Sequence, residues 1–259
     1  MTFPDAKQRF SNRAADYARY RPGYPSALYD LLARQCGLQT HHVIADIGSG
    51  TGLLSRLFLD RGNGVYGIEP NAEMRSAGQE TLHSWSNFTS VDGSAEATTL
   101  PDSSVDFVTV GQAFHWFDVA STQREFRRIL KPSGWVVIVW QDRRMHETRF
   151  AQDYENVLQR FAVDYKSVKD TYPETEKMRR FFDSGTFESH QLRNHQDFDW
   201  EGLQGRLRSS SYAPTESHPN YLPMMAELRR IFDTHQSNRI VTMEYFAHVY
   251  LGKLAGCTP

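Results

Sequence analysis

The stretch VIADIGSGTG, residues 43–52, decides the fold of this chain of 259 residues. Its first half is an apolar run of strand length, and an apolar helical face follows it over 53–58. The glycines between them, Gly48, Gly50 and Gly52, permit dihedral angles closed to other residues and let the main chain approach a ligand closely. A strand, a glycine turn and a helix in this order are typical of a nucleoside-binding α/β fold.

Short apolar runs alternate with stretches of helical period from residue 43 to 140, which is the pattern of βαβ units and a parallel sheet. After the first strand, further strands are predicted at 64–69, 88–91, 106–110 and 135–140. A helix is expected to end at Lys131–Gly134, before the fifth strand. The sequence therefore predicts the α/β class, with a doubly wound, mostly parallel sheet.

The pattern changes after residue 140. Two late segments, 187–200 and 240–254, favour strands that complete the sheet as a hairpin-like edge. The stretches 141–185 and about 201–220 are expected to be helical insertions over the sheet. The Met and aromatic stripe at 221–232 has helical spacing and is expected to be core.

Composition excludes several classes of protein. The chain has 29 Lys and Arg against 31 Asp and Glu, so it lacks the basic excess of a nucleic-acid-binding protein. The longest apolar run, 135–140, is far shorter than the roughly 20 residues that span a bilayer. The first thirty residues contain no apolar core of a signal peptide, so a cytoplasmic location without membrane partners is expected. The two cysteines and scattered histidines predict neither a disulfide framework nor a metal site.

The glycine turn contains two departures from a dinucleotide-binding motif. Leu53 stands where that motif needs a small residue, and Asp46 places a negative charge where a pyrophosphate would gain nothing from it. A cationic ligand would benefit from this charge. Glu69 ends the second strand, at a position from which a carboxylate can accept hydrogen bonds from both ribose hydroxyls. The alternative is an ordinary surface glutamate.

Polar residues also follow the third and fourth strands. In the turn after the third strand, Ser94 and the backbone of Ala95 could edge an adenine, or the segment could be a plain turn. The fourth strand ends in GQAFHWF, residues 111–117. Gln112 is a candidate for a cofactor or backbone contact. His115 is a candidate general base with an ordinary pKa of about 6.5, and the alternative is a structural histidine that orients the loop.

Taken together, the DxGxGxG turn, the strand-ending glutamate, the GSAE turn and the FHWF segment resemble a class I S-adenosylmethionine-dependent methyltransferase. They are most similar to the small-molecule group that includes the trans-aconitate and quinone-ring C-methyltransferases. The resemblance covers residues 41–140. It implies the Rossmann-like methyltransferase fold with a late antiparallel strand, and S-adenosyl-L-methionine as the cofactor. It also implies that Asp46 and the Gly48 backbone face the methionine ammonium, that Glu69 holds the ribose, and that Ser94, where many relatives have Asp, borders the adenine with Ala95.

The opening segment FSNRAADYARYRPGYP, residues 10–25, resembles the lid of the same group. Arg21 is expected to pair with the methionine carboxylate, and Tyr17 and Tyr20 to exclude water, with an amphipathic surface helix as the alternative. The segment 1–24, which includes Phe10, is expected to become ordered when cofactor binds. The predicted cofactor-binding residues are Tyr20, Arg21, Asp46, Gly48, Ser49, Gly50, Glu69, Ser94, Ala95 and Gln112, and the candidate catalytic residue is His115.

The resemblance implies three regions: N-terminal lid helices at 1–40, an S-adenosylmethionine-binding core at 41–140, and insertions with the final strands at 141–259. The expected activity is methyl transfer to a small-molecule acceptor, a carboxylate or an aromatic compound. Late arginines, among them Arg206, could supply charge for such an acceptor. The residues expected to line its pocket are Trp140, Tyr154 and Tyr212, with Arg143 or Arg208 for a carboxylate. Two alternatives are a protein that binds the cofactor without turnover and a nicotinamide-dependent oxidoreductase.

Overall fold

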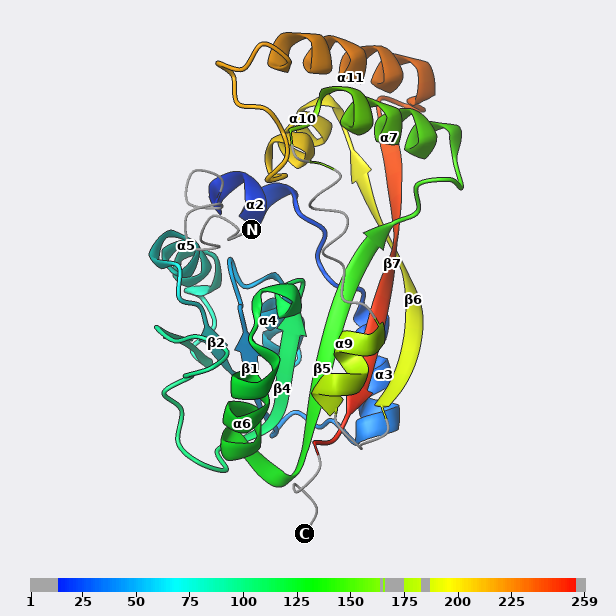
Figure 1. Cartoon of the computed structure of the whole chain (residues 1–259). Coiled ribbons are helices and arrows are strands. Elements are labelled where there is room, and N and C mark those ends of the chain that lie inside the picture. Colours follow the sequence, from blue (N-terminus) through cyan, green and yellow to red (C-terminus); the bar gives the residue numbers. More distant parts are fainter. Residues whose placement is uncertain (1–13, 164, 166–174, 183–186, 255–259) are drawn as a thin grey trace.

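The structure, a computed structural model, describes residues 14–163, 165, 175–182 and 187–254. One seven-stranded sheet in the order β3-β2-β1-β4-β5-β7-β6 forms its centre (Figure 1). The pairs among β1 to β5 are parallel, whereas β7 is antiparallel to both β5 and β6. This confirms the predicted doubly wound sheet with a late antiparallel strand. The strands are β1 (Val43–Ile47), β2 (Gly64–Ile68), β3 (Phe88–Val91), β4 (Val105–Gly111), β5 (Leu130–Arg143), β6 (Phe187–Phe198) and β7 (Val241–Gly252).

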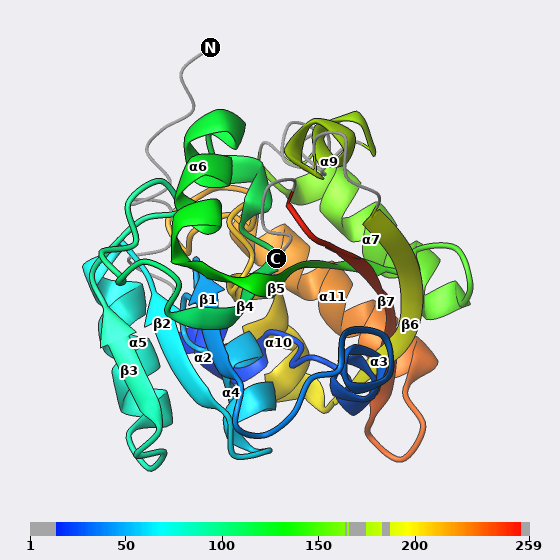
Figure 2. The same ribbon diagram turned by 90° about the horizontal axis from the view of Figure 1, so that it is seen from below.

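Helices cover both faces of the sheet (Figure 2). Apolar residues of α3 and α4 pack on one face, and those of α6 and α9 pack on the other. None of the helices in the described part is long and apolar enough to cross a membrane. The helices are α2 (Ala14–Tyr20), α3 (Ser26–Cys36), α4 (Leu53–Leu59), α5 (Ala72–Leu82), the short 3-10 helix η2 (Phe114–Trp116), α6 (Val119–Ile129), α7 (Arg149–Phe161), α9 (Thr175–Phe182), α10 (Trp200–Arg208) and α11 (Tyr221–His235).

The fifth strand begins earlier than the sequence indicates. We expected Lys131–Gly134 to separate the helix from the strand, but α6 ends at Ile129 and β5 already begins at Leu130, paired with Val105. A register shift between Val105 and Phe107 accommodates the extra residues. The Lys131 ammonium donates to both carboxylate oxygens of Asp106, at 2.9 and 2.8 Å, and this ion pair holds the early part of β5 against β4.

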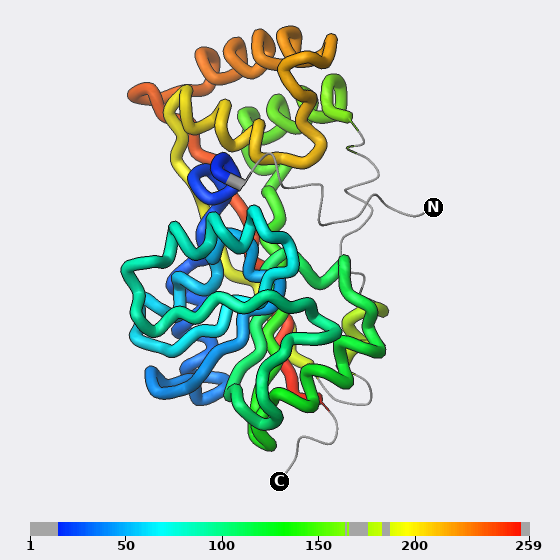
Figure 3. The backbone as a smooth tube through the Cα atoms, turned by 90° about the vertical axis from the view of Figure 1, so that its left-hand side faces the viewer, coloured from blue at the N-terminus to red at the C-terminus, as the bar shows by residue number. Residues whose placement is uncertain are grey.

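Strands β5, β6 and β7 have 14, 12 and 12 residues, against four to seven in the other strands. Their extra length continues beyond the carboxyl ends of β1 and β4 and supports α7, α10 and α11 (Figures 1 and 3). These three helices share a separate apolar core with the carboxyl end of β6 and the amino end of β7. We call this part the cap. It includes Met224, Leu228 and Phe232 of the predicted stripe, which are buried as expected.

The expected insertions therefore occupy two different places. Helices α7 and α10 belong to the cap, whereas α9 packs beside α6 on a face of the sheet. Residues 141–143, which we assigned to the first insertion, continue β5. Helix α2 contacts both α10 in the cap and α5 in the sheet layer, so it joins the two parts (Figure 3).

Candidate functional site

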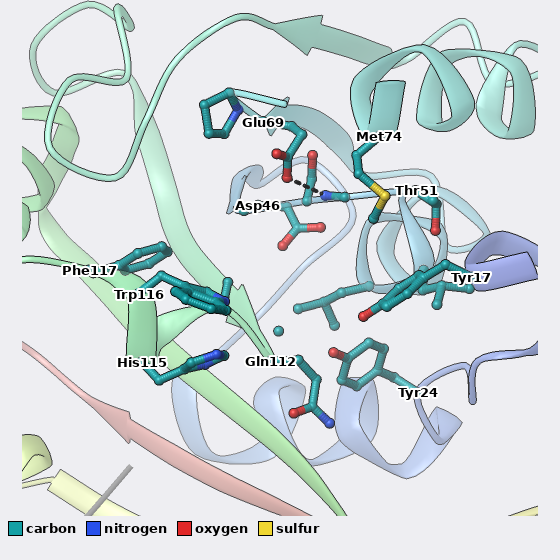
Figure 4. A pocket seen from close by; sticks show the side chains of 18 residues that line it. Tyr17, Tyr24, Asp46, Thr51, Glu69, Met74, Gln112, His115, Trp116 and Phe117 are labelled. Carbon is teal, nitrogen blue, oxygen red and sulfur yellow. Dashed lines mark hydrogen bonds between the residues drawn. The ribbon is translucent and has the colours of Figure 1, made fainter. Parts of the chain in front are cut away.

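A pocket lies at the carboxyl ends of β1, β2 and β4, where the order of the strands reverses and α/β folds bind their ligands. The glycine turn, the end of β2, the segment after β4 and the region of α2 contribute to it (Figure 4). The lining residues are Tyr17, Tyr24, Asp46, Gly48, Ser49, Gly50, Thr51, Leu53, Leu54, Glu69, Pro70, Met74, Gly111, Gln112, Ala113, His115, Trp116 and Phe117.

The glycine turn has a backbone shape that favours glycine. Gly48 has φ +68° and Gly50 has φ +56°, which side-chain-bearing residues rarely adopt. A Cβ on Gly48 would lie 2.6 Å from the Cβ of Ala113, and one on Gly50 would lie 3.2 Å from Cε of Met74. The turn therefore brings its main chain directly against the segment after β4 and against α5.

Several N–H groups of this turn already have acceptors inside the protein. Those of Gly48 and Ser49 donate to the carbonyl of Ile68 at 2.8 and 3.1 Å. The N–H of Gly50 donates to Oε2 of Glu69 at 2.9 Å. A pyrophosphate bound at a turn of this kind needs such N–H groups for its own oxygens. The turn is thus poorly suited to a dinucleotide.

Asp46 is a buried carboxylate at the base of the pocket, with 1% of its surface exposed. Its oxygens accept hydrogen bonds from the hydroxyls of Ser55, at 2.6 Å, and Thr109, at 3.3 Å. Burial raises the pKa of Asp46 to about 6, although these hydrogen bonds lower it. No lysine or arginine of the described residues lies within ion-pair distance of this carboxylate. A cationic ligand would supply the missing charge.

Glu69, the residue after β2, provides the second carboxylate of the pocket (Figure 4). Besides the bond from Gly50, its Oε1 accepts from the N–H of Asn71 at 2.9 Å. These two bonds fix the carboxylate while leaving lone pairs on both oxygens. Burial raises the pKa of Glu69, and the two backbone bonds oppose that shift. The group can accept hydrogen bonds from a pair of ligand hydroxyls.

The segment after β4 forms the opposite wall. Gln112 lies in the pocket with φ +60°, and its side-chain amide donates to the carbonyl of Gln141 at 2.9 Å. The His115 ring lies 4.5 Å from the Trp116 ring and meets the edge of Trp140 at 5.2 Å, measured between centroids. The imidazole thus faces the pocket with aromatic groups around it, a position from which it could accept a proton from a bound molecule.

Lys177 on α9 holds this segment from outside the pocket, and sequence reasoning missed it. Its ammonium donates to the carbonyls of Phe114 and His115 at 3.1 and 3.2 Å. The sequence of an amphipathic helix does not indicate such a role for one of its lysines, because the role depends on where α9 packs. The lysine fixes the backbone that carries the imidazole.

The predicted lid residues divide into two groups. Tyr17 and Tyr24 line the pocket, whereas Tyr20 and Arg21 do not. The Tyr20 hydroxyl donates to Glu201 at 3.3 Å, and Arg21 donates to the carbonyl of Ser209 at 3.0 Å. Both therefore face the cap, and their assignment to the cofactor stays a prediction. Phe10 and the rest of 1–13 lie outside the described residues.

Ser94 and Ala95 do not line the pocket either. They form a tight turn in which the N–H of Ser94 donates to the carbonyl of Ala97 at 3.1 Å. Their proposed place beside an adenine stays a prediction. Of the residues assigned from the sequence, the pocket brings together Asp46, Gly48, Ser49, Gly50, Glu69, Gln112 and His115. It adds Thr51 and Met74, which the motifs did not single out as ligand contacts.

Comparisons with known proteins agree with this geometry. Residues 45–138 match the family model described as a methyltransferase domain. An uncharacterized methyltransferase of Mycobacterium tuberculosis is 34% identical over 143 residues, which is 54% of either chain. An uncharacterized methyltransferase of Schizosaccharomyces pombe is 32% identical over 135 residues, which is 51% of either chain. The matched stretch thus spans about half the length of these curated relatives.

Solved structures show the same fold over nearly the whole chain. A candidate type II methyltransferase of Anaeromyxobacter dehalogenans superposes with a TM-score of 0.65 and 20% identity, covering 93% of this chain and 99% of that one. A candidate methyltransferase from an antibiotic biosynthesis pathway of Anabaena variabilis superposes with a TM-score of 0.65 and 21% identity, covering 92% and 99%. The fold is therefore the Rossmann-like methyltransferase fold. The likeness to the trans-aconitate and quinone-ring group stays a prediction.

Proposed function

We propose that the chain is an enzyme that transfers a methyl group from S-adenosyl-L-methionine to a small-molecule acceptor. The observation that carries the proposal is the pair of fixed pocket carboxylates, Asp46 and Glu69, which have no ion-pair partner in the described part of the chain. A ligand with positive charge at one end and vicinal hydroxyls nearby fits both. Asp46 would hold the methionine ammonium, and Glu69 would hold the ribose hydroxyls.

The bound cofactor supplies a methyl group that is already activated as part of a sulfonium. The protein then has to position the acceptor and exclude water. His115 would remove the proton from an acceptor such as a phenol, an amine or a carbon acid. A carboxylate acceptor carries no such proton and needs no base.

Incubation with cofactor labelled in its methyl group, across a panel of small carboxylates, phenols and amines, tests the activity. We expect label to appear in at least one acceptor and to be lost in Asp46→Ala. Cofactor binding without transfer to any acceptor would instead support the non-catalytic alternative. Transfer to RNA or protein alone would contradict the small-molecule acceptor.

The pKa of Asp46 predicts how binding depends on pH. A cationic ligand stabilises the ionised carboxylate, so binding must lower the pKa of about 6 that Asp46 has without ligand. Affinity for S-adenosylhomocysteine, whose ammonium is the cation, should therefore be constant above this pKa. Below it, affinity should fall by up to about tenfold per pH unit, because the carboxyl must release a proton on binding.

Calorimetric titration from about pH 5 to about pH 8 checks this expectation. The variant Asp46→Asn cannot titrate at this position. It should bind weakly at high pH, and its affinity should depend less on pH. An affinity of the wild-type protein that does not change across this range would show that Asp46 does not face the ammonium.

The lid hypothesis predicts a change in hydrogen exchange. Tyr17 and Tyr24 line the pocket, so a bound ligand adds contacts to the segment 17–24. Helix α2, which carries Tyr17, also contacts both α10 and α5. We expect the amides of 17–24 to exchange more slowly with S-adenosylhomocysteine, while those of α11, on the outer side of the cap, stay unchanged. Equal exchange of 17–24 with and without ligand would refute the lid.

A further inference from the structure

Three arginines from distant parts of the chain meet where the cap joins the sheet. Arg206 on α10 is 3% exposed. Its Nε donates to the Tyr245 hydroxyl at 3.2 Å, and its Nη1 donates to the Ser210 hydroxyl at 3.0 Å. Both partners are uncharged. The guanidinium is thus buried with hydrogen bonds, and the described residues give it no counter-ion.

Arg143, at the end of β5, belongs to the same group. Its Nη2 donates to Glu155 at 3.1 Å and to the Tyr165 hydroxyl at 2.7 Å, and the guanidinium lies over the Tyr154 ring. Glu155 is 3% exposed and is the single carboxylate that forms an ion pair with any of the three arginines in the described part.

Arg21, after α2, completes the group. It forms no ion pair with any described residue. Its guanidinium donates to the carbonyl of Ser209 and lies 4.9 Å from the centroid of the Tyr17 ring. Burial and the positive charge of Arg206 lower the pKa of Arg21. Burial alone would raise the pKa of the nearby Tyr212, but Arg143, Arg206 and Arg21 outweigh it and bring that pKa to about 8. The positive charges of the three arginines therefore all act on the region around Tyr212.

We call Arg21, Arg143 and Arg206 the arginine cluster. The cluster carries three positive charges, and Glu155 neutralises one of them. Burying charges without partners is costly, so this excess calls for an explanation. Several buried donors also have no hydrogen-bond acceptor among the described residues. They are Nη1 of Arg143, Nε of Arg21 and the hydroxyl of Tyr154. Charge and unused donors both indicate an anionic ligand.

The cluster lies next to the proposed cofactor pocket. The Tyr17 ring, which contacts Arg21, lines that pocket. Gln141, two residues before Arg143 on β5 and so on the same face of the strand, accepts at its carbonyl from the side-chain amide of Gln112, which lines the pocket. A molecule held by the arginines would therefore lie on the cap side of the pocket, where an acceptor has to approach.

We propose that the arginine cluster binds the anionic part of the acceptor, a small molecule with two negative charges. This inference rests on the proposed function and names the class of its substrate. Guanidinium groups bind carboxylates and phosphates in the same bidentate way, and two negative charges match the excess of the cluster. Two carboxylates, or one phosphate, would supply two negative charges and the oxygen acceptors for these guanidinium groups.

The test uses binding of probe anions to the full chain, saturated with S-adenosylhomocysteine. Malonate and succinate represent dicarboxylates, inorganic phosphate represents the phosphate source, and the uncharged diamide of malonate is the neutral control. We expect a dicarboxylate or phosphate to raise the melting temperature, whereas the diamide does not. The anion that acts identifies the source. No shift with any of the anions, or an equal shift with the diamide, would overturn the proposal.

The variant Arg206→Met separates a ligand-binding role from a structural one. Because Arg206 forms no ion pair with any described residue, its replacement by an apolar chain of similar length should leave the melting temperature unchanged or higher without ligand. Its affinity for the active anion should fall by about tenfold or more, as expected for lost hydrogen bonds to a charged group. The matched control Arg229→Met removes an exposed arginine of the cap, paired with Asp233, and should bind like the wild type.

Cofactor binding distinguishes failure of this inference from failure of the proposed function. We expect Arg206→Met to retain wild-type affinity for S-adenosylhomocysteine. If the wild-type protein does not bind S-adenosylhomocysteine, the proposed function fails. If it binds S-adenosylhomocysteine but Arg206→Met keeps full affinity for the anion, or melts well below the wild type, only the arginine cluster as an acceptor site is refuted.

Discussion

Replacement of Gly50 by valine is expected to weaken binding of S-adenosylhomocysteine by about a hundredfold or more. A β-branched residue at φ +56° is strained by roughly 1–2 kcal/mol. The new Cβ would also lie 3.2 Å from Cε of Met74, and the branches would extend toward the pocket that both residues line. Strain and crowding together shift the turn that positions Glu69 through the Gly50 N–H. Calorimetric titration measures the loss.

Gly62→Val is the matched control for this variant. Gly62 has φ +92°, so valine is strained there too, but a Cβ at this position would meet nothing within 4 Å. Gly62 lies in the loop after α4, away from the pocket. We expect Gly62→Val to lower the melting temperature while affinity for S-adenosylhomocysteine stays at the wild-type value. Equal losses of affinity in both variants would show that instability, and not the pocket, accounts for the effect.

Replacement of Glu69 by alanine is expected to weaken binding of S-adenosylhomocysteine by about tenfold to a hundredfold. The variant loses the acceptors for the ribose hydroxyls, and hydrogen bonds to a charged group contribute about 1.5–3 kcal/mol. Gly50 lines the pocket, so water can reach its N–H in the variant, and the fold should survive. The control Glu73→Ala removes an exposed carboxylate on α5 and should not change the affinity. Unchanged affinity in Glu69→Ala would refute the ribose assignment.

The sequence predicted the parallel part of the fold well, because its strands are short, apolar and separated by helices of clear period. The third strand agrees residue for residue with β3, Phe88–Val91. The start of β5 could not be predicted, since Lys131–Gly134 looks like a turn. In the structure Lys131 forms an ion pair with Asp106 on β4, and a register shift accommodates the extra residues before Trp135.

Much of the proposed cofactor site was also predictable, because a single continuous motif contains Asp46, Gly48 and Gly50, and Glu69 follows the next strand. The arginine cluster was not. Arg143 and Arg144 are adjacent in the sequence, yet Arg143 faces the cluster while Arg144 forms an ion pair with Glu244. Which of them points inward depends on the extension of β5 past residue 140, and that extension follows from pairing with β7.

We propose that the pocket binds S-adenosylmethionine and not a nicotinamide dinucleotide. Calorimetric titration of the wild-type chain with S-adenosylhomocysteine and, separately, with NADH tests it most directly. The uncompensated Asp46 and the N–H groups already used within the turn predict saturable binding of S-adenosylhomocysteine at one site and no binding of NADH. Saturable binding of NADH without binding of S-adenosylhomocysteine would contradict the account.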